Sequence, residues 1–190
     1  MLVLVAAGFT AAAQNWSNEQ LMKANTVREV QELAPEEKLA VLYLNLARMY
    51  PKEFVAKELD DYYGPKNSGD YLKYSAYKKT LVAMMDKMEP MEPLSFDNAL
   101  FENVVCFAKE QGESGATGHD RVSCPAMAGA AECASYGMET GRDIAMQWLI
   151  DDKVESLGHR KACLQKSYSK VGISMNAHKL YRYCAVADFR

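Results

Sequence analysis

Two of the three histidines stand in similar local sequences and are the first candidates for chemistry. His119 lies in "GHDR" and His159 in "GHR", so each follows a glycine and precedes an arginine within two residues. Both fall in expected loops at helix ends, where binding residues are disproportionately found. His178 lies in a polar turn and is expected to be solvated. For each candidate histidine, the alternative is a hydrogen-bonded structural role.

The sequence contains neither a compact metal motif nor the signature of an activated nucleophile. There is no HExxH, no CxxC pair and no closely spaced pair of histidines, so a metal site would need ligands from distant segments. Ser156 lies near His159 but outside any GxSxG elbow, and Cys163 has no supporting local signature. Nucleophilic catalysis is therefore not indicated.

Length and charge indicate one compact domain and make some classes of binding partner unexpected. A chain of 190 residues with 49% hydrophobic content can form one compact domain with a substantial core. The 22 basic and 25 acidic residues are spread along the chain and give a net charge of -3. Since no block of like charge is present, DNA, RNA and a polybasic membrane contact are not expected.

The first residues, "MLVLVAAGFTAAAQ", form an apolar run that ends in small residues of the kind a signal peptidase accepts. Residues 1–13 are interpreted as a signal peptide, with a short core helix as the alternative because a basic n-region is missing. The run is too short to span a bilayer, which needs about 20 residues. We expect a secreted or periplasmic protein without a transmembrane segment.

Five cysteines in an exported chain allow two disulfides and one remaining thiol. Cys124 and Cys133 bracket the short loop "CPAMAGAAEC" and could close it. Cys163 and Cys184 could tie a helix to the last strand. The alternative is that these cysteines are buried small hydrophobic residues, because free cysteine packs well in cores.

The elements that must position these residues follow from the spacing of apolar residues. Four amphipathic helices are predicted: one within 34–59 that ends or bends at Pro51, one within 71–88 whose methionines face the core, one capped by Asp97, and one capped by Thr140. Two strands follow, "KVGISMN" and "LYRYCAVADFR", joined as a hairpin through "AHK". Helices first and strands last indicate an α+β domain with an antiparallel sheet covered by helices.

Several short motifs occur in an order that resembles one known family. They are "LNLARMYP", "EPLSFDNAL", "GHDR", "AECASYG", "QWLIDD", "GHRKACL", "KVGISM" and the aromatic strand "YRYCAVADF". The chain resembles the CAP superfamily, which contains cysteine-rich secretory proteins, antigen 5 and pathogenesis-related 1, in its bacterial secreted form. The resemblance covers residues 36–190, which leaves 14–35 as an N-terminal extension.

The resemblance implies an α-β-α sandwich with a central cleft lined by two histidines and two acidic residues. Matched position by position, the cleft residues are His119, Glu132, Asp151 and His159, with Arg160 turned into the scaffold. Two departures from the family pattern affect the acidic residues. The "GEN" motif is replaced by "AEC" at 131–133, and an aspartate stands where the family has glutamate, so that Asp152 is an alternative to Asp151.

Two neutral imidazoles bind zinc or a similar divalent ion, and nearby carboxylates can fix their tautomers. His119 and His159 are therefore the expected metal ligands. With only two protein ligands, the ion should be weakly bound and should be lost as the histidines protonate below about pH 6.

Three functions remain open at this stage. The preferred one is a non-enzymatic secreted binding module, which holds a divalent metal in the cleft and contacts a lipid, another small apolar ligand or a protein partner at the cell exterior. Tyrosines in and after the loop "DDYYGPKNSGD" could form the apolar surface or could cap the core instead, namely Tyr62, Tyr63, Tyr71, Tyr74 and Tyr77. The second is a metal-assisted hydrolase or peptidase with Glu132 as general base. The third makes the four cleft residues a buried hydrogen-bond network.

Overall fold

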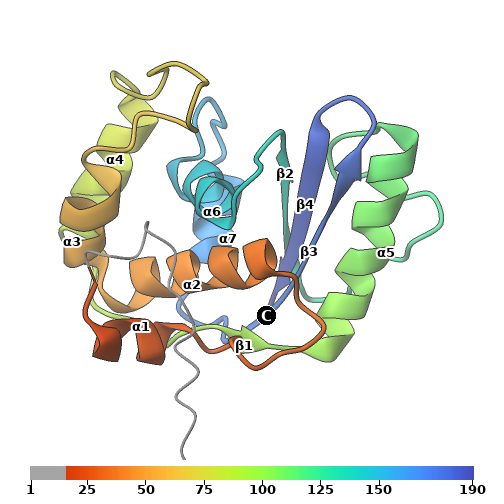
Figure 1. The fold of residues 1–190 in the computed structure, drawn as a ribbon, viewed down its shortest axis with the longest axis horizontal. Helices are drawn as coiled ribbons and strands as arrows, with labels where there is room; N and C mark the ends of the chain where they lie inside the picture. Colours follow the sequence, from red (N-terminus) through yellow and green to blue (C-terminus); the bar gives the residue numbers. More distant parts are fainter. Residues whose placement is uncertain (1–15) are drawn as a thin grey trace, which may run out of the picture.

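The computed structural model describes residues 16–190 and arranges them in three layers around a central sheet (Figure 1). Helix α5 (Asn98–Ser114) covers one face of the sheet. Helices α2 (Pro35–Met49), α6 (Gly141–Ile150) and α7 (Gly158–Cys163) cover the other. The predicted α+β class and the α-β-α sandwich are confirmed. The proposed signal peptide, residues 1–13, lies outside the described residues.

The remaining helices extend the layer that contains α2. They are α1 (Asn18–Ala24), α3 (Pro51–Phe54), the π-helix η2 (Val55–Leu59) and α4 (Ala76–Met85). As predicted, the first long helix breaks before Pro51, which becomes the first residue of α3. Helix α1 packs on α2 through the buried residues Leu21 and Ala24, so the segment before residue 36 shares the main core.

Both predicted helix caps are present. The Asp97 carboxylate accepts a hydrogen bond from the Leu100 amide at 3.0 Å and begins α5. The Thr140 hydroxyl accepts from the Asp143 amide at 3.1 Å and begins α6. Each cap satisfies one of the amide groups that a helix start leaves without a partner.

The sheet contains β1 (Ser95–Phe96), β2 (Ala131–Tyr136), β3 (Lys170–His178) and β4 (Arg182–Phe189), in the spatial order β1-β3-β4-β2. The predicted hairpin is the β3–β4 pair, but β3 continues through His178, so the turn lies at 179–181 and not at "AHK". Strand β1 runs parallel to β3, so the sheet is mixed and not purely antiparallel as predicted. Strand β2, which pairs with β4, was not predicted.

His178 is buried, and the expectation that it is solvated was wrong. Its Nε2 lies 2.9 Å from the carbonyl oxygen of Ala116, and its Nδ1 accepts from the amides of Leu180 and Tyr181. The side chain is 4% exposed. The ring closes the β3–β4 turn and ties it to the segment that follows α5, because every polar atom of the ring is used.

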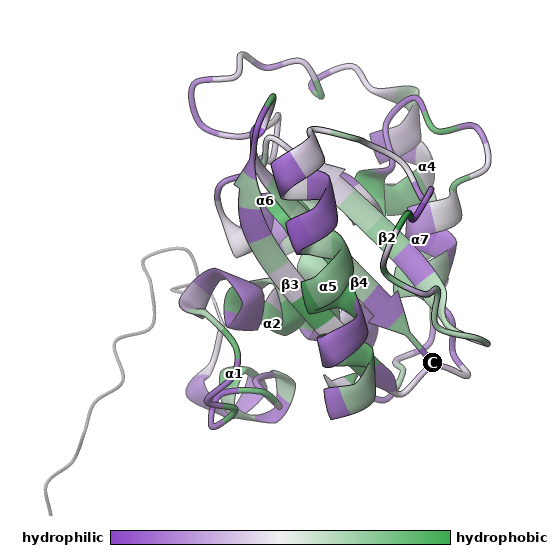
Figure 2. Cartoon of the chain, turned by 90° about the vertical axis from the view of Figure 1, so that its right-hand side faces the viewer, coloured by the Kyte–Doolittle hydropathy of each residue, from purple (hydrophilic) through white to green (hydrophobic). Residues whose placement is uncertain are grey.

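Residues that alternate along β4 pack against the helices on opposite faces of the sheet. Val186 packs with Phe107 and Ala108 of α5, whereas Ala187 and Phe189 belong to the larger core on the other face. Figure 2 looks onto α5 with the hydrophobic strands behind it. Because side chains alternate along a strand, Cys184 points toward α5 as Val186 does, and its Sγ lies 3.4 Å from the Ala108 carbonyl oxygen.

Both predicted disulfides were wrong. The structure joins Cys106 to Cys124, with Cα atoms 5.8 Å apart, and leaves Cys133, Cys163 and Cys184 as buried thiols. Each predicted pair, Cys124 with Cys133 and Cys163 with Cys184, would have to cross the sheet. Cys124 and Cys184 lie on the α5 side, whereas Cys133 and Cys163 belong to the core on the other side.

No helix within residues 16–190 combines the length and hydropathy that crossing a bilayer requires.

Helix α5 approaches β3 so closely at Gly172 that a side chain has no room there. A Cβ atom at this position would overlap the backbone of Leu100 and Phe101. We predict that Gly172→Ala lowers the free energy of unfolding by about 3 kcal/mol, because overpacking against backbone cannot be relieved by a rotamer change. The control is Gly158→Ala, whose Cβ would make only an ordinary contact. Urea unfolding of both variants measures the difference, and equal midpoints would contradict the prediction.

Candidate functional site

Two histidine–carboxylate pairs lie next to each other where β2 meets the α6–α7 junction. His119 Nδ1 is 2.6 Å from Glu132 Oε1, and His159 Nδ1 is 2.7 Å from Asp151 Oδ1. The two imidazole ring centres are 6.3 Å apart. The structure therefore brings together all four residues named from the sequence, although they come from four different segments.

These residues border a small cleft with a volume of about 250 Å³. The lining residues are Gly118, His119, Ala134, Tyr136, Gln147, Asp151, Asp152, Val154 and His159. Glu132 lies behind His119 and lines an adjoining hollow together with Arg121 and Asp188. Asp152, the alternative to Asp151, contacts neither histidine through a hydrogen bond and instead accepts one from the Ser75 hydroxyl at 2.5 Å.

The Asp151–His159 pair depends on an unusual backbone path between α6 and α7. Asp151 ends α6 with a φ of 55°, and Leu157 precedes α7 with a φ of 52°, both in the left-handed region that non-glycine residues seldom adopt. The Asp151 carboxylate also accepts from the Arg160 amide at 3.2 Å, so it caps α7 while it orients His159. The Arg160 side chain turns away from the cleft and donates to the carbonyl oxygens of Leu149 and Ile150.

His119 lies on an irregular segment, and two side chains that sequence reasoning missed hold the residue before it. The Tyr136 hydroxyl accepts from the Gly118 amide at 2.8 Å and donates to Gln111 Oε1 at 3.0 Å. Gln111 Nε2 in turn donates to the Gly118 carbonyl oxygen at 2.6 Å. Tyr136 lies four residues after Glu132 in β2, and residues separated by an even number share a face of a strand. That spacing is the signal that could have identified it.

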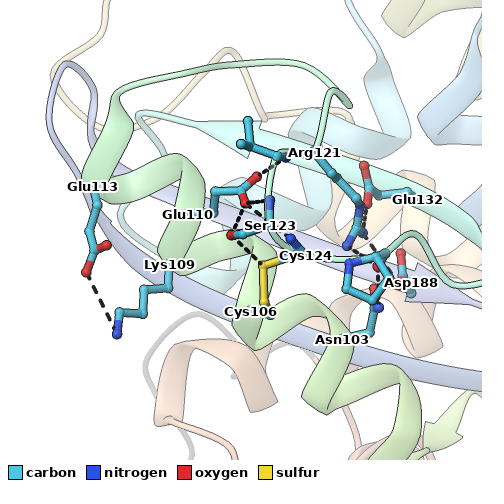
Figure 3. Close-up of a disulfide and its surroundings, with 12 residues drawn as sticks. Asn103, Cys106, Lys109, Glu110, Glu113, Arg121, Ser123, Cys124, Glu132 and Asp188 are labelled. Atoms are coloured by element: carbon cyan, nitrogen blue, oxygen red, sulfur yellow. Dashed lines mark hydrogen bonds and ion pairs between the residues drawn. A yellow bond between two sulfur atoms is a disulfide. The ribbon is translucent and has the colours of Figure 1, made fainter.

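Glu132 is held between His119 and the Arg121 guanidinium, and Figure 3 shows the contact with Arg121. One carboxylate oxygen pairs with His119, and the other pairs with Arg121. The Arg121 guanidinium also lies over the Phe107 ring, 4.1 Å from its centre, and donates to the Pro125 carbonyl oxygen. The hydrogen bond to Glu132 is the main cause that raises the pKa of His119, and burial partly opposes it.

Asp188 is a buried carboxyl group that the sequence did not single out. It is 1% exposed and lies opposite Glu132 in the β2–β4 register. Its Oδ2 has no hydrogen-bond partner among the described residues, and Arg121 approaches it only to 4.0 Å. Burial, together with the charge of Glu132, raises the pKa of Asp188 to about 7, although Arg121 opposes this shift.

The segment that carries His119 and Arg121 is fastened to α5 by a disulfide and a carboxylate (Figure 3). The bond between Cys106 and Cys124 joins it covalently. One turn further along α5, Glu110 accepts from the amides of Val122 and Ser123 at 2.9 and 2.6 Å. The hydrogen bond from the Ser123 hydroxyl contributes most to lowering the pKa of Glu110 to about 2, and the two amide hydrogen bonds add to this effect.

The donor set of the cleft fits an open divalent-metal site. Each histidine uses Nδ1 toward a carboxylate, which leaves each Nε2 without a hydrogen bond in the part of the chain that the structure describes. Two imidazoles on one tetrahedral ion, each with a metal–nitrogen distance of about 2.1 Å, have centres about 5 Å apart, so the rings, now 6.3 Å apart, would approach by about 1 Å on binding. Within residues 16–190, no three His, Cys, Asp or Glu side chains gather as a metal cluster, so the protein itself would supply only two ligands.

The fold and the site together define a class of protein, namely a small α-β-α domain whose cleft is formed by two histidine–carboxylate pairs. The profile of the CAP family, described as the cysteine-rich secretory protein family, matches residues 25–189, and the chain belongs to this family. No curated protein sequence matches the chain significantly. Among solved structures, an outer surface protein from Borrelia burgdorferi is similar at 17% identity and a TM-score of 0.43, covering 60% of this chain and 86% of that one.

The unpaired carboxyl of Asp188 should make the protein less stable as the pH rises. Because its pKa is about 7 in the folded chain and ordinary in the unfolded chain, the folded state binds more protons between about pH 4 and 7. Stability from this group is therefore present at low pH and is lost as the pH passes through 7. We predict that Asp188→Asn removes this loss and gains on the order of 1–3 kcal/mol at pH 8 relative to wild type.

Urea unfolding at pH 5 and pH 8 measures the effect. Asp120→Asn, an exposed aspartate on the neighbouring segment, serves as the control and should leave the difference between the two pH values unchanged. An Asp188→Asn variant that keeps the full wild-type pH dependence would contradict the role assigned to this carboxyl.

The disulfide should stabilise the protein mainly by restricting the unfolded chain. The two cysteines are 18 residues apart, and a loop of this size is worth about 3 kcal/mol in the chain-entropy estimate. We predict that Cys106→Ser lowers the unfolding free energy by about this amount and speeds amide hydrogen exchange at Val122 and Ser123. Cys184→Ser, which removes a thiol outside the disulfide, should leave exchange at those two amides unchanged. Unaltered exchange in Cys106→Ser would show that hydrogen bonds such as those of Glu110 hold the segment without the disulfide.

Proposed function

We propose that the protein is an exported, non-enzymatic binding module of the CAP family whose cleft holds a divalent cation on His119 and His159. One observation carries the proposal: both Nδ1 atoms are committed to carboxylates, while neither Nε2 atom has a hydrogen-bond partner within residues 16–190, and both histidines line the same cleft. A metal-binding histidine usually donates its other ring nitrogen to a carboxylate, which fixes the tautomer and strengthens the ligand.

A cation on two histidines would keep open coordination positions. Structural zinc normally takes four protein ligands, whereas an open site accepts water or a ligand atom in the remaining positions. His119 has 56% of its side chain exposed and His159 has 22%, so exchange with solvent is unhindered. The bound ion would act as a Lewis acid that attracts an oxygen atom of a ligand.

Glu132 is poorly suited to act as the base of the alternative hydrolase. Both of its oxygens are paired, one with His119 and the other with Arg121. To take a proton from water, Glu132 would have to break one of these contacts. The binding module is therefore preferred over the hydrolase.

The apolar surface considered for a lipid or protein partner reduces to two tyrosines. Tyr71 and Tyr74 are 51% and 81% exposed, and they flank Lys73. Tyr62 is buried and donates its hydroxyl to Asp143, and Tyr77 packs against the core. Tyr63 is half-buried, and the Lys78 ammonium group lies 4.5 Å from its ring centre. Two aromatic rings beside a lysine form a small surface, which is better suited to a partner at the cell exterior than to enclosing a lipid.

Export is supported by the apolar run at 1–13 and by the disulfide. Disulfides persist in oxidising compartments such as the periplasm and the cell exterior, and they are rare in the cytosol. The bond between Cys106 and Cys124 fits that environment.

Zinc binding tests the proposed function directly. We predict that the wild type binds about one zinc ion per chain in calorimetry and that the His119→Ala, His159→Ala double variant binds none. Asp151→Asn should weaken zinc binding by about 10–100-fold, because a partner of a ligating histidine is lost. The matched control is His178→Ala, which changes the remaining histidine and should retain the zinc.

A screen for hydrolysis with and without chelator separates the alternatives. Zinc binding without turnover supports the module, and chelator-sensitive turnover would favour the hydrolase. If neither wild-type zinc binding nor turnover is measured, the four residues are a structural hydrogen-bond network and the proposed function is wrong.

A further inference from the structure

Gln147 lies in the last turn of α6 and is fixed on both sides. Its backbone carbonyl accepts from the Asp151 amide at 2.9 Å. The next residue, Trp148, donates its indole N–H to the Ala134 carbonyl oxygen of β2 at 3.0 Å. This turn therefore cannot move relative to the strand that carries Glu132, and the Gln147 side chain starts from a rigid position.

A buried serine determines which end of the Gln147 amide faces the cleft. Ser135 is 1% exposed, and its hydroxyl donates to Gln147 Oε1 at 2.5 Å. Because Oε1 is occupied by Ser135, Nε2 is the atom left for the cleft, and none of the hydrogen bonds within residues 16–190 uses it.

The other polar groups that line the cleft are already committed or act as acceptors. The Tyr136 hydroxyl donates to Gln111, and Asp151 is held by His159. Each Nε2 of the two histidines is an acceptor when its Nδ1 carries the proton. The Gln147 amide thus offers two unused N–H donors beside the position proposed for the cation.

We propose that Gln147 is a ligand-binding residue, whose side-chain amide donates to an sp² oxygen of a small ligand, either a carboxylate or an amide carbonyl. This inference rests on the proposed function, because the same oxygen-bearing group would also be attracted by a cation on the two histidines. A cleft of about 250 Å³ limits the ligand, or the part of it that enters, to about ten non-hydrogen atoms, since a cavity of about 150 Å³ holds benzene.

The experiment is a titration of ¹⁵N-labelled protein, zinc-free and zinc-loaded, with acetate and separately with acetamide. The side-chain amide resonance of Gln147 is identified by its absence from Gln147→Glu. We expect this resonance to shift and saturate with at least one probe in both forms, and at lower probe concentration when zinc is present. Tighter binding of acetate would indicate an acid as the ligand, and tighter binding of acetamide would indicate an amide.

Gln147→Glu keeps the shape and the Ser135 hydrogen bond but replaces the donor with an acceptor. We expect it to weaken acetate binding about tenfold or more, because a hydrogen bond is lost and a like charge is added. Gln31→Glu, an exposed residue that adds the same charge elsewhere, should titrate like the wild type. The inference is overturned if the Gln147 resonance responds to neither probe in either form, or if Gln147→Glu binds acetate as the wild type does.

The zinc content of the protein, measured before the titration, tests the proposed function separately from the inference about Gln147. If zinc is not retained, the cation site is wrong, and the zinc-free titration still decides whether Gln147 binds the oxygen. If zinc is retained and the Gln147 resonance does not respond, only the inference about Gln147 is wrong.

Discussion

Two buried guanidinium groups fix the short helix that carries His159. Arg160, within α7, donates to the carbonyl oxygens of Leu149 and Tyr77, and so joins the ends of α6 and α4. Arg48, which is fully buried in α2, donates to the carbonyl oxygens of Cys163 and Tyr168 beyond the other end of α7. A six-residue helix is not stable by itself, so the position of α7 depends on these contacts. Both charges are stabilised by peptide carbonyl groups, which need arginine's planar set of donors and cannot be matched by lysine.

The two histidines are supported in different ways. His159 is attached to a buried scaffold through Asp151, whose side chain is 1% exposed, and through Arg160. His119 lies on an irregular segment that is held by Tyr136, a disulfide and Glu110. The His159 side of the cleft is therefore fixed by the main core, whereas the His119 side is fixed by separate contacts to α5 and β2.

The regular elements and the cleft residues could be predicted for different reasons. Helix caps at Asp97 and Thr140 and the β3–β4 hairpin follow from local chemistry, which a sequence displays directly. The cleft residues followed from motif order alone, because no local rule joins segments so far apart. Strand β2 was missed because "AECASY" consists mostly of small residues with weak strand preference, and its alternation becomes meaningful only opposite β4. The disulfides were mispredicted for the same reason, since the face on which each cysteine lies is set by strand pairing.

Strand β2 organises both halves of the cleft through its alternating residues. Glu132 and Tyr136 point to one face and orient His119, whereas Ser135 points to the other and orients Gln147. A one-residue slip against β4 would exchange the two sets and separate the histidines from their partners. Because β2 is the edge strand of the sheet, with β4 as its only strand neighbour in the described residues, its other edge is free to face α6 and the cleft. The edge position of β2 gives a ligand access to the histidines. It also leaves the register of β2 to be fixed by side chains, and these contacts come from Trp148, Gln147 and Arg121.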